Sequence, residues 1–168
     1  MRRLALAVFG FPLALGAQQP GSPTALLNRM TGHWVMRGTI AKQETVHDVD
    51  VQWVLRREYV QIHEVSRDRD STGAPKYEAI IYLEWDAKKG EYAVLWLDNT
   101  AQYAFGSGYI GRGKPAPGRI ALIFPDPNGN DHTTFAYDPA KDTWTWTIDT
   151  EKKDGTLAPF ARTVLSRK

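Results

Sequence analysis

The residues best suited to bind a ligand or to transfer a proton are a histidine and a glutamate, His47 and Glu64, in two neighbouring strand-like segments. If the chain reverses around Arg56 and Arg57, Val49 lies opposite Glu64, and His47 is a diagonal neighbour on the same face. A buried carboxyl group is costly unless it is paired or protonated. The pair could therefore anchor a ligand head group or transfer a proton. The alternative is an ordinary ion pair near a rim, where both groups reach water.

This register also decides which face of the two strands points inward. It places Val51 opposite Ile62 on an apolar face and leaves Asp50 and His63 on the outer surface. A slip of one residue would invert the assignment, and two arginines are a weak turn signal. Apolar residues of two later hairpins are also expected to point into the barrel. Such residues form an ordinary hydrophobic core unless they surround a cavity. The ligand-lining candidates are His47, Val49, Val51, Trp53, Ile62, Glu64, Ile81, Leu83, Val94, Trp96, Phe135 and Trp146.

Several segments resemble known binding or catalytic motifs but lack the residue spacing or the secondary structure that those motifs require. The glycine-rich GSGYIG at 106–111 precedes RGKPAPG, which cannot open a phosphate-binding helix, so it predicts a bulged strand and a loop. The DPNGND segment at 126–131 lacks the spacing of a calcium loop and predicts a hairpin turn. The four histidines show no metal-ligand spacing, and G-x-S-x-G does not occur. We therefore expect no metal and no cofactor, and assign no catalytic residue.

Strand-like segments rich in Val, Ile, Thr, Tyr and Trp position these residues. Turn signals separate them at short intervals, and no helical stretch is long enough for a βαβ unit. Two segments, WDAKKGEYAVLW at 85–96 and YDPAKDTWTWTI at 137–148, predict hairpins of the same construction. The expected strands are His33–Ala41, Thr45–Leu55, Tyr59–Val65, Tyr77–Trp85, Tyr92–Asp98, Tyr103–Ile110, Arg119–Phe124, Thr133–Tyr137, Trp144–Asp149 and Phe160–Ser166.

An all-β fold follows, an antiparallel meander barrel of about eight to ten strands with a short N-terminal helix. Closure removes the two free edges of such a sheet. Ser22 can cap the helix, and Pro23 suits its first turn. Gly32 permits a tight turn into the first strand, and Trp34 would then close the floor of the barrel. A cation over that ring would stabilise it, and the last strand offers Arg162.

These features resemble the calycin superfamily. Lipocalins carry a Gly-x-Trp after a short helix and stack an arginine from the end of the barrel on that tryptophan, which corresponds here to Gly32, Trp34 and Arg162. The chain looks most like a family of small exported bacterial barrels of unestablished function. W-V-L at 53–55, W-L-D at 96–98 and the closing FARTVLSRK carry that resemblance. It implies a barrel and a ligand cavity but no reaction. Many lipocalins have a disulfide, which this chain without cysteine cannot form.

The N-terminus has the layout of a secretory signal peptide: a basic start, an apolar run from Leu4 to Leu15, then small residues. We expect cleavage after Ala17 or Gly16, and one domain over 18–168. Loss of residues 1–17 removes two arginines, which leaves 19 basic against 19 acidic residues. That balance argues against nucleic-acid binding and against a basic membrane-binding face. The mature chain is expected to be secreted or periplasmic, with no membrane insertion.

The expected role is binding of a small, largely apolar ligand inside the barrel. One rival is an enzyme of unknown reaction that uses Glu64 and His47, although the absence of a catalytic motif argues against it. The other is a filled barrel whose surface binds a protein partner of unknown identity. A carrier requires an open cavity, an enzyme requires in addition a perturbed acid or base there, and an interaction module requires a filled interior.

Overall fold

The computed structural model describes residues 22–101 and 110–168. The expected signal peptide over 1–17 lies outside these ranges, as do most of GSGYIG at 106–111 and most of the strand expected at 103–110. The elements are α1 (Pro23–Met30), β1 (Gly32–Ile40), β2 (Gln43–Val54), the 3-10 turn η1 (Leu55–Arg57), β3 (Tyr59–Ser66), β4 (Glu78–Asp86), β5 (Glu91–Asp98), β6 (Ile110–Gly113), β7 (Pro115–Ala116), β8 (Arg119–Phe124), β9 (Asp131–Asp138), β10 (Thr143–Glu151) and β11 (Leu157–Arg167).

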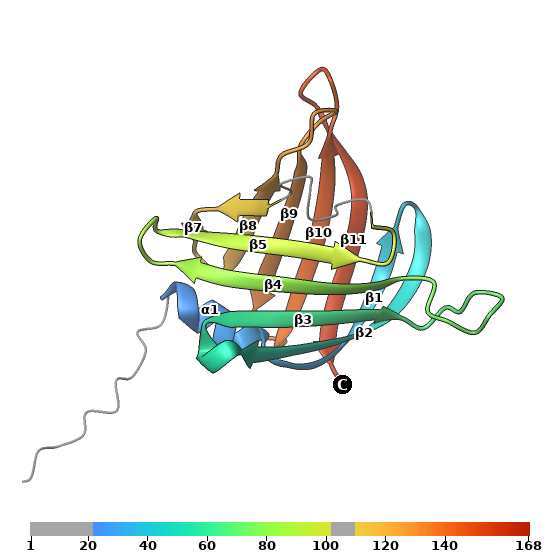
Figure 1. Ribbon diagram of the computed structural model, residues 1–168, viewed down its shortest axis with the longest axis horizontal. Coiled ribbons are helices and arrows are strands. Elements are labelled where there is room, and N and C mark those ends of the chain that lie inside the picture. Colours follow the sequence, from blue (N-terminus) through green and yellow to red (C-terminus); the bar gives the residue numbers. More distant parts are fainter. Residues whose placement is uncertain (1–21, 102–109) are drawn as a thin grey trace, which may run out of the picture.

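Strands β1–β6 and β8–β11 form a closed antiparallel barrel of ten strands, which confirms the predicted fold class, and the two-residue β7 pairs with β8 beside it. Neighbouring strands follow the chain from β1 to β6 on one side and from β11 back to β7 on the other, and β1 pairs with β11. The circle closes where β6 meets β8, with Arg112 opposite Ile123. Figure 1 shows β3, β4 and β5 crossing in front of β9, β10 and β11 at a steep angle. Closure leaves the long strands without a free edge.

The register predicted for β2 and β3 is confirmed. Val49 lies opposite Glu64 and Val51 opposite Ile62. All four of these side chains are buried, whereas the side chains of Asp50 and His63 on the other face are 58% and 39% exposed.

The turn that sets this register is held from outside the hairpin. Leu55, Arg56 and Arg57 have φ angles of 48°, 59° and 68°, in the left-handed region that costs about 1–2 kcal/mol per residue. The side-chain oxygen of Asn28 in α1 accepts hydrogen bonds from Arg57 at 2.9 Å and from Trp53 at 2.8 Å. Contacts with the helix therefore fix a turn whose own sequence gives a weak signal.

The two repeated segments form hairpins of the same construction. The aspartate that ends the first strand of each, Asp86 or Asp138, accepts a hydrogen bond from the backbone N–H two residues later, at 3.0 and 2.9 Å. Each also pairs with the lysine three residues later, Lys89 or Lys141. The hairpin predicted from DPNGND is present as well, because it joins β8 to β9.

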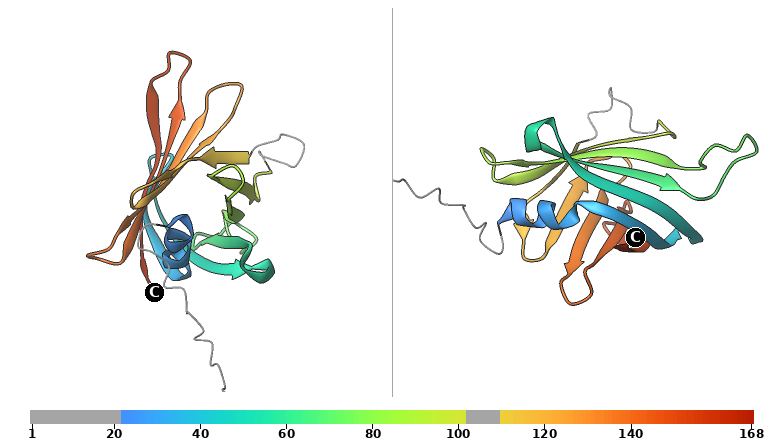
Figure 2. Two further views of the ribbon diagram at one scale, coloured as in Figure 1. Left: turned by 90° about the vertical axis from the view of Figure 1, so that its left-hand side faces the viewer. Right: turned by 90° about the horizontal axis from the view of Figure 1, so that it is seen from below.

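The end of the barrel beside α1 is closed by the helix and a tryptophan. Figure 2 shows α1 lying across this end between the two layers of strands. Ser22 caps the helix and Pro23 occupies its first turn, as predicted. Trp34 has no exposed surface, and its indole N–H donates to the carbonyl of Met30 at 2.8 Å. Gly32 has a φ of 132°, where a Cβ would meet the guanidinium of Arg167 at 2.2 Å.

The cation over Trp34 is Arg167, which corrects the assignment of Arg162. The guanidinium carbon of Arg167 lies 3.7 Å from the ring centroid. Strand register explains the difference, because Trp34 lies opposite Arg167, whereas Arg162 lies opposite Thr39, nearer the other end of β1. Arg162 instead pairs with Asp149 on β10.

We expect Arg167→Ala to lower the free energy of unfolding more than Arg162→Ala does. Loss of the cation over Trp34 costs about 0.5–2 kcal/mol, and two hydrogen bonds from Arg167 to the carbonyls of Thr31 and Arg29 are lost with it. Urea unfolding of the two matched variants measures the difference. An equal or larger loss for Arg162→Ala would contradict the assignment.

Candidate functional site

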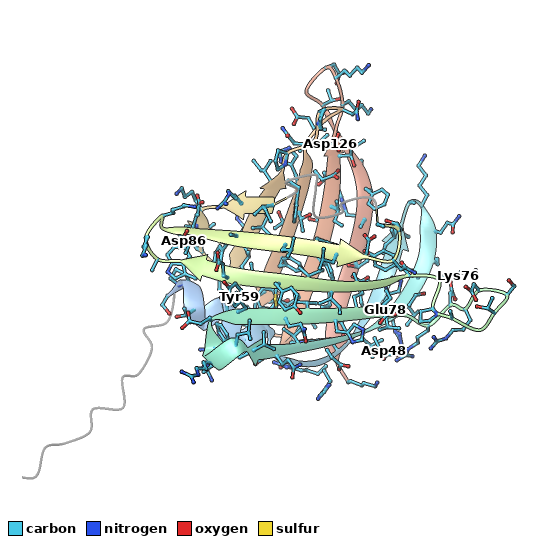
Figure 3. All side chains as sticks on the ribbon, in the orientation of Figure 1. Asp48, Tyr59, Lys76, Glu78, Asp86 and Asp126 are labelled. Atoms are coloured by element: carbon cyan, nitrogen blue, oxygen red, sulfur yellow. The ribbon has the colours of Figure 1, made fainter. Side chains whose placement is uncertain are left out.

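A cavity of about 650 Å³ occupies the half of the barrel away from α1. Its wall is formed by residues near the end of β1, β3, β5, β8 and β10, near the start of β2 and β9, and in the middle of β11. Two of its lining residues are labelled in Figure 3, where Asp126 lies at the top and Lys76 at the right. Asp86 and Tyr59 lie toward the opposite end, on the side of α1.

The barrel is filled at one end and hollow at the other because the inward side chains differ in size. Large apolar residues meet across the interior near α1, where they form one packed cluster. At the other end several buried inward positions hold small side chains that cannot reach across. These small residues are Ser66, Thr133, Ala161 and Thr163.

Four of the ligand-lining candidates line this cavity, namely His47, Glu64, Trp96 and Trp146. The others lie in the filled half, which corrects the expectation that they form a cavity wall. Trp53 packs against the core and donates to Asn28. The remaining seven are core residues: Val49, Val51, Ile62, Ile81, Leu83, Val94 and Phe135.

His47 and Glu64 form a buried hydrogen-bonded pair in the inner wall of the cavity. Their side chains are 4% and 2% exposed, and His47 Nδ1 lies 2.5 Å from Glu64 Oε1. The other ring nitrogen, Nε2, lies 2.6 Å from the hydroxyl of Thr45. The two side chains therefore lie in the interior, where the predicted register placed them, and not at a rim where both groups would reach water.

A second polar pair, Tyr77 and Asp98, lies beside the first and was not identified from the sequence. The Tyr77 hydroxyl donates to the Asp98 carboxylate at 3.3 Å and accepts from the indole N–H of Trp96 at 3.1 Å. The ring of Tyr77 stacks on that of His47, with 5.9 Å between the centroids. Tyr77 immediately precedes β4, and Asp98 ends β5. Side chains alternate between the two faces of a strand, so both residues could have been assigned to the inner face from their sequence positions.

Burial raises the pKa of two groups in this cluster, Glu64 and Tyr77. Loss of solvation raises the pKa of Glu64, the bond and charge of His47 act against that rise, and the charge of Asp98 adds to it. Burial also raises the pKa of Tyr77, and the charges of Glu64 and Asp98 raise it further. Both shifts arise because burial removes the charged forms from water.

The raised pKa of Glu64 predicts a pH-dependent effect of Glu64→Gln on stability. A carboxyl group whose folded pKa lies above its unfolded value contributes most to stability below 4.5 and loses that contribution as the pH rises through the folded value. The stability of Glu64→Gln relative to the wild type should therefore increase from acid to alkaline pH. Urea unfolding of both proteins across this range measures the trend, and a constant difference would contradict it.

An aromatic wall adjoins the polar cluster, because Trp96, which donates to Tyr77, also packs against two other rings. Trp96 packs against Trp146 with 5.5 Å between ring centroids and against Phe124 with 6.1 Å. All three residues line the cavity. The indole N–H of Trp146 is buried and has no hydrogen-bond partner among the residues that the structure describes.

The mouth of the cavity is acidic. Five carboxylates, those of Glu44, Asp68, Asp98, Asp126 and Asp131, line it together with one lysine, Lys76. Among the described residues, no group of three or more His, Asp or Glu side chains is placed to hold a metal ion. No helix within the described ranges is long and apolar enough to cross a membrane.

Comparison with known proteins assigns this chain to no family. No protein-family model matches the chain, and no curated protein shows significant similarity to it. The chain is thus identified by its architecture, as a closed ten-stranded antiparallel β-barrel with a small N-terminal helix, which is consistent with a calycin-like barrel.

Proposed function

We propose that this protein is an exported, calycin-like carrier that binds a small, partly apolar ligand in the open half of its barrel. The cavity supports this proposal most directly, because its volume of about 650 Å³ falls in the range of small-molecule sites. Its lining combines a large aromatic surface with a few convergent polar groups, the usual composition of such sites. The signal-like N-terminus supports release of the mature chain into the periplasm or the medium.

The fluorescence of the cavity tryptophans tests this proposal. Trp96 and Trp146 both line the cavity, so a ligand that enters it changes the environment of two indole rings. Titration of the mature protein with amphiphiles that share one short chain should give a saturable change in emission. The absence of saturable binding for every member of such a panel would argue against a carrier.

A second candidate function is an enzyme, and one specific observation favours it. The Thr45 hydroxyl, the His47 ring and the Glu64 carboxyl form a continuous hydrogen-bonded chain at the cavity wall. In such a chain the histidine can take a proton from a hydroxyl group or a water while the carboxyl orients it. Turnover of activated esters that disappears in His47→Gln and in Thr45→Val would support this candidate.

The cavity argues against the third possibility, a filled barrel that acts only through its surface. A barrel of that type requires packed side chains along its whole length, whereas the half away from α1 holds the cavity.

A further inference from the structure

Most of the carboxylates at the cavity mouth are not neutralised by ion pairs among the described residues, unlike many of those on the outer surface. On the outer surface, Asp48 pairs with Arg67 at 2.8 Å and Glu91 with Arg112 at 2.9 Å. Within the described ranges, no such ion pair forms at four carboxylates of the mouth, those of Glu44, Asp68, Asp98 and Asp126. A concave site lined by uncompensated charge of one sign concentrates ions of the opposite sign.

The polar partners that these carboxylates do have are neutral. Asp98 accepts from the hydroxyl groups of Tyr77 and Thr100, and Asp126 accepts from a backbone N–H in its own turn. Lys76 is the only lysine or arginine among the described residues that line the cavity. The mouth therefore attracts cations and repels anions.

The aromatic wall supplies an independent reason to expect a cation with an organic body. The faces of tryptophan and phenylalanine attract ammonium groups, most strongly where water is excluded. Trp96, Trp146 and Phe124 line the same cavity as the mouth carboxylates. The buried indole N–H of Trp146, which has no partner in the described part of the chain, also offers a donor to an oxygen atom of a bound molecule.

A metal ion fits this site less well. Metal binding needs several ligand atoms that converge on one point, and no such group of residues occurs in the described ranges. The mouth carboxylates come from separate elements around the cavity, from the start of β2 to the start of β9. Diffuse negative charge above an aromatic pocket suits a single positive charge on an apolar molecule.

We propose that the ligand of this barrel is an organic cation, a protonated amine or a quaternary ammonium compound with an apolar body. The ammonium group lies among the mouth carboxylates at the edge of the aromatic wall, where a ring face can contact it, and the apolar body lies against Trp96, Trp146 and Phe124. This inference rests on the proposed function, since it names the chemical class of the ligand for the same cavity.

Titration with three compounds that share an octyl chain tests the inference. The compounds are octyltrimethylammonium, octyl glucoside and octanoate, and binding is followed by tryptophan fluorescence or calorimetry. We expect the cation to bind about tenfold or more tightly than the neutral compound, and octanoate to bind weakest. Raising the salt from about 0.01 to about 1 M shortens the screening length from about 30 to about 3 Å and should weaken binding of the cation selectively.

Two charge-neutralising variants locate the effect. The double substitution Glu44→Gln and Asp68→Asn removes two mouth carboxylates and should lower affinity for octyltrimethylammonium while leaving that for octyl glucoside unchanged. The control is Glu58→Gln, an exposed acid that follows η1 at the other end of β2, which should change neither affinity.

The outcomes separate this inference from the proposed function. Equal binding of the cation and the neutral compound, or tighter binding of octanoate, would overturn the cation inference and leave the ligand site intact. Failure of all three compounds to bind saturably would count against both.

Discussion

Trp34→Ala should lower the free energy of unfolding by about 3–5 kcal/mol, the cost of truncating a buried large aromatic side chain. Trp34 has no exposed surface and belongs to the core cluster at the closed end of the barrel. The substitution also removes the hydrogen bond to Met30 and the ring beneath Arg167. Urea or thermal unfolding of the purified variant measures the loss.

Trp34→Phe is the matched control for this effect. It keeps an aromatic ring in the core but removes the indole N–H that donates to Met30, so its loss should be clearly smaller than that of Trp34→Ala. A loss near zero for Trp34→Ala would show that the tryptophan does not hold the closed end together.

Thr133→Trp should abolish ligand binding, because it places a large side chain in the cavity. Thr133 is 2% exposed, lies on β9 and lines the cavity. The new indole occupies space that the wild-type protein leaves open, so the expected change in stability stays within the range of about 1–3 kcal/mol that extra side-chain volume costs in a packed core. Fluorescence titration with octyltrimethylammonium or octyl glucoside measures the loss of binding.

Thr134→Trp is the control, since the next residue along β9 lies on the other face of the strand. Side chains alternate along a strand, and Thr134 is absent from the cavity lining. The same increase in volume there should leave affinity unchanged. Binding that survives Thr133→Trp, or that is lost equally in both variants, would contradict placement of the ligand in this cavity.

The barrel could be predicted because its strands carry alternation and turn signals that are local in sequence. The register of β2 and β3 followed from a reversal supposed around Arg56 and Arg57 and from the apolar face that it aligns, and it placed His47 beside Glu64 in the interior. The hairpins at Asp86 and Asp138 followed from a repeated pattern of residue types. Each of these inferences uses residues close together in the chain.

The features that could not be predicted depend on register between distant strands and on the three-dimensional packing of side chains. Arg162 and Arg167 are both plausible partners for Trp34 in sequence, and only the pairing of β1 with β11 selects Arg167. Strand alternation marks Val49 and Glu64 as equally inward, but it does not tell the filled half of a barrel from the hollow half. The acidic mouth was missed for the same reason, since its carboxylates come from separate elements.

Native mass spectrometry of the mature protein, purified gently from a host that exports it, tests whether the barrel holds a ligand. We expect the wild-type protein to carry a bound small molecule, or to take up octyltrimethylammonium when it is added, and we expect Thr133→Trp to do neither while Thr134→Trp behaves like the wild type. A wild-type protein that stays free of any added mass with octyltrimethylammonium and octyl glucoside would rule out a ligand site in the cavity.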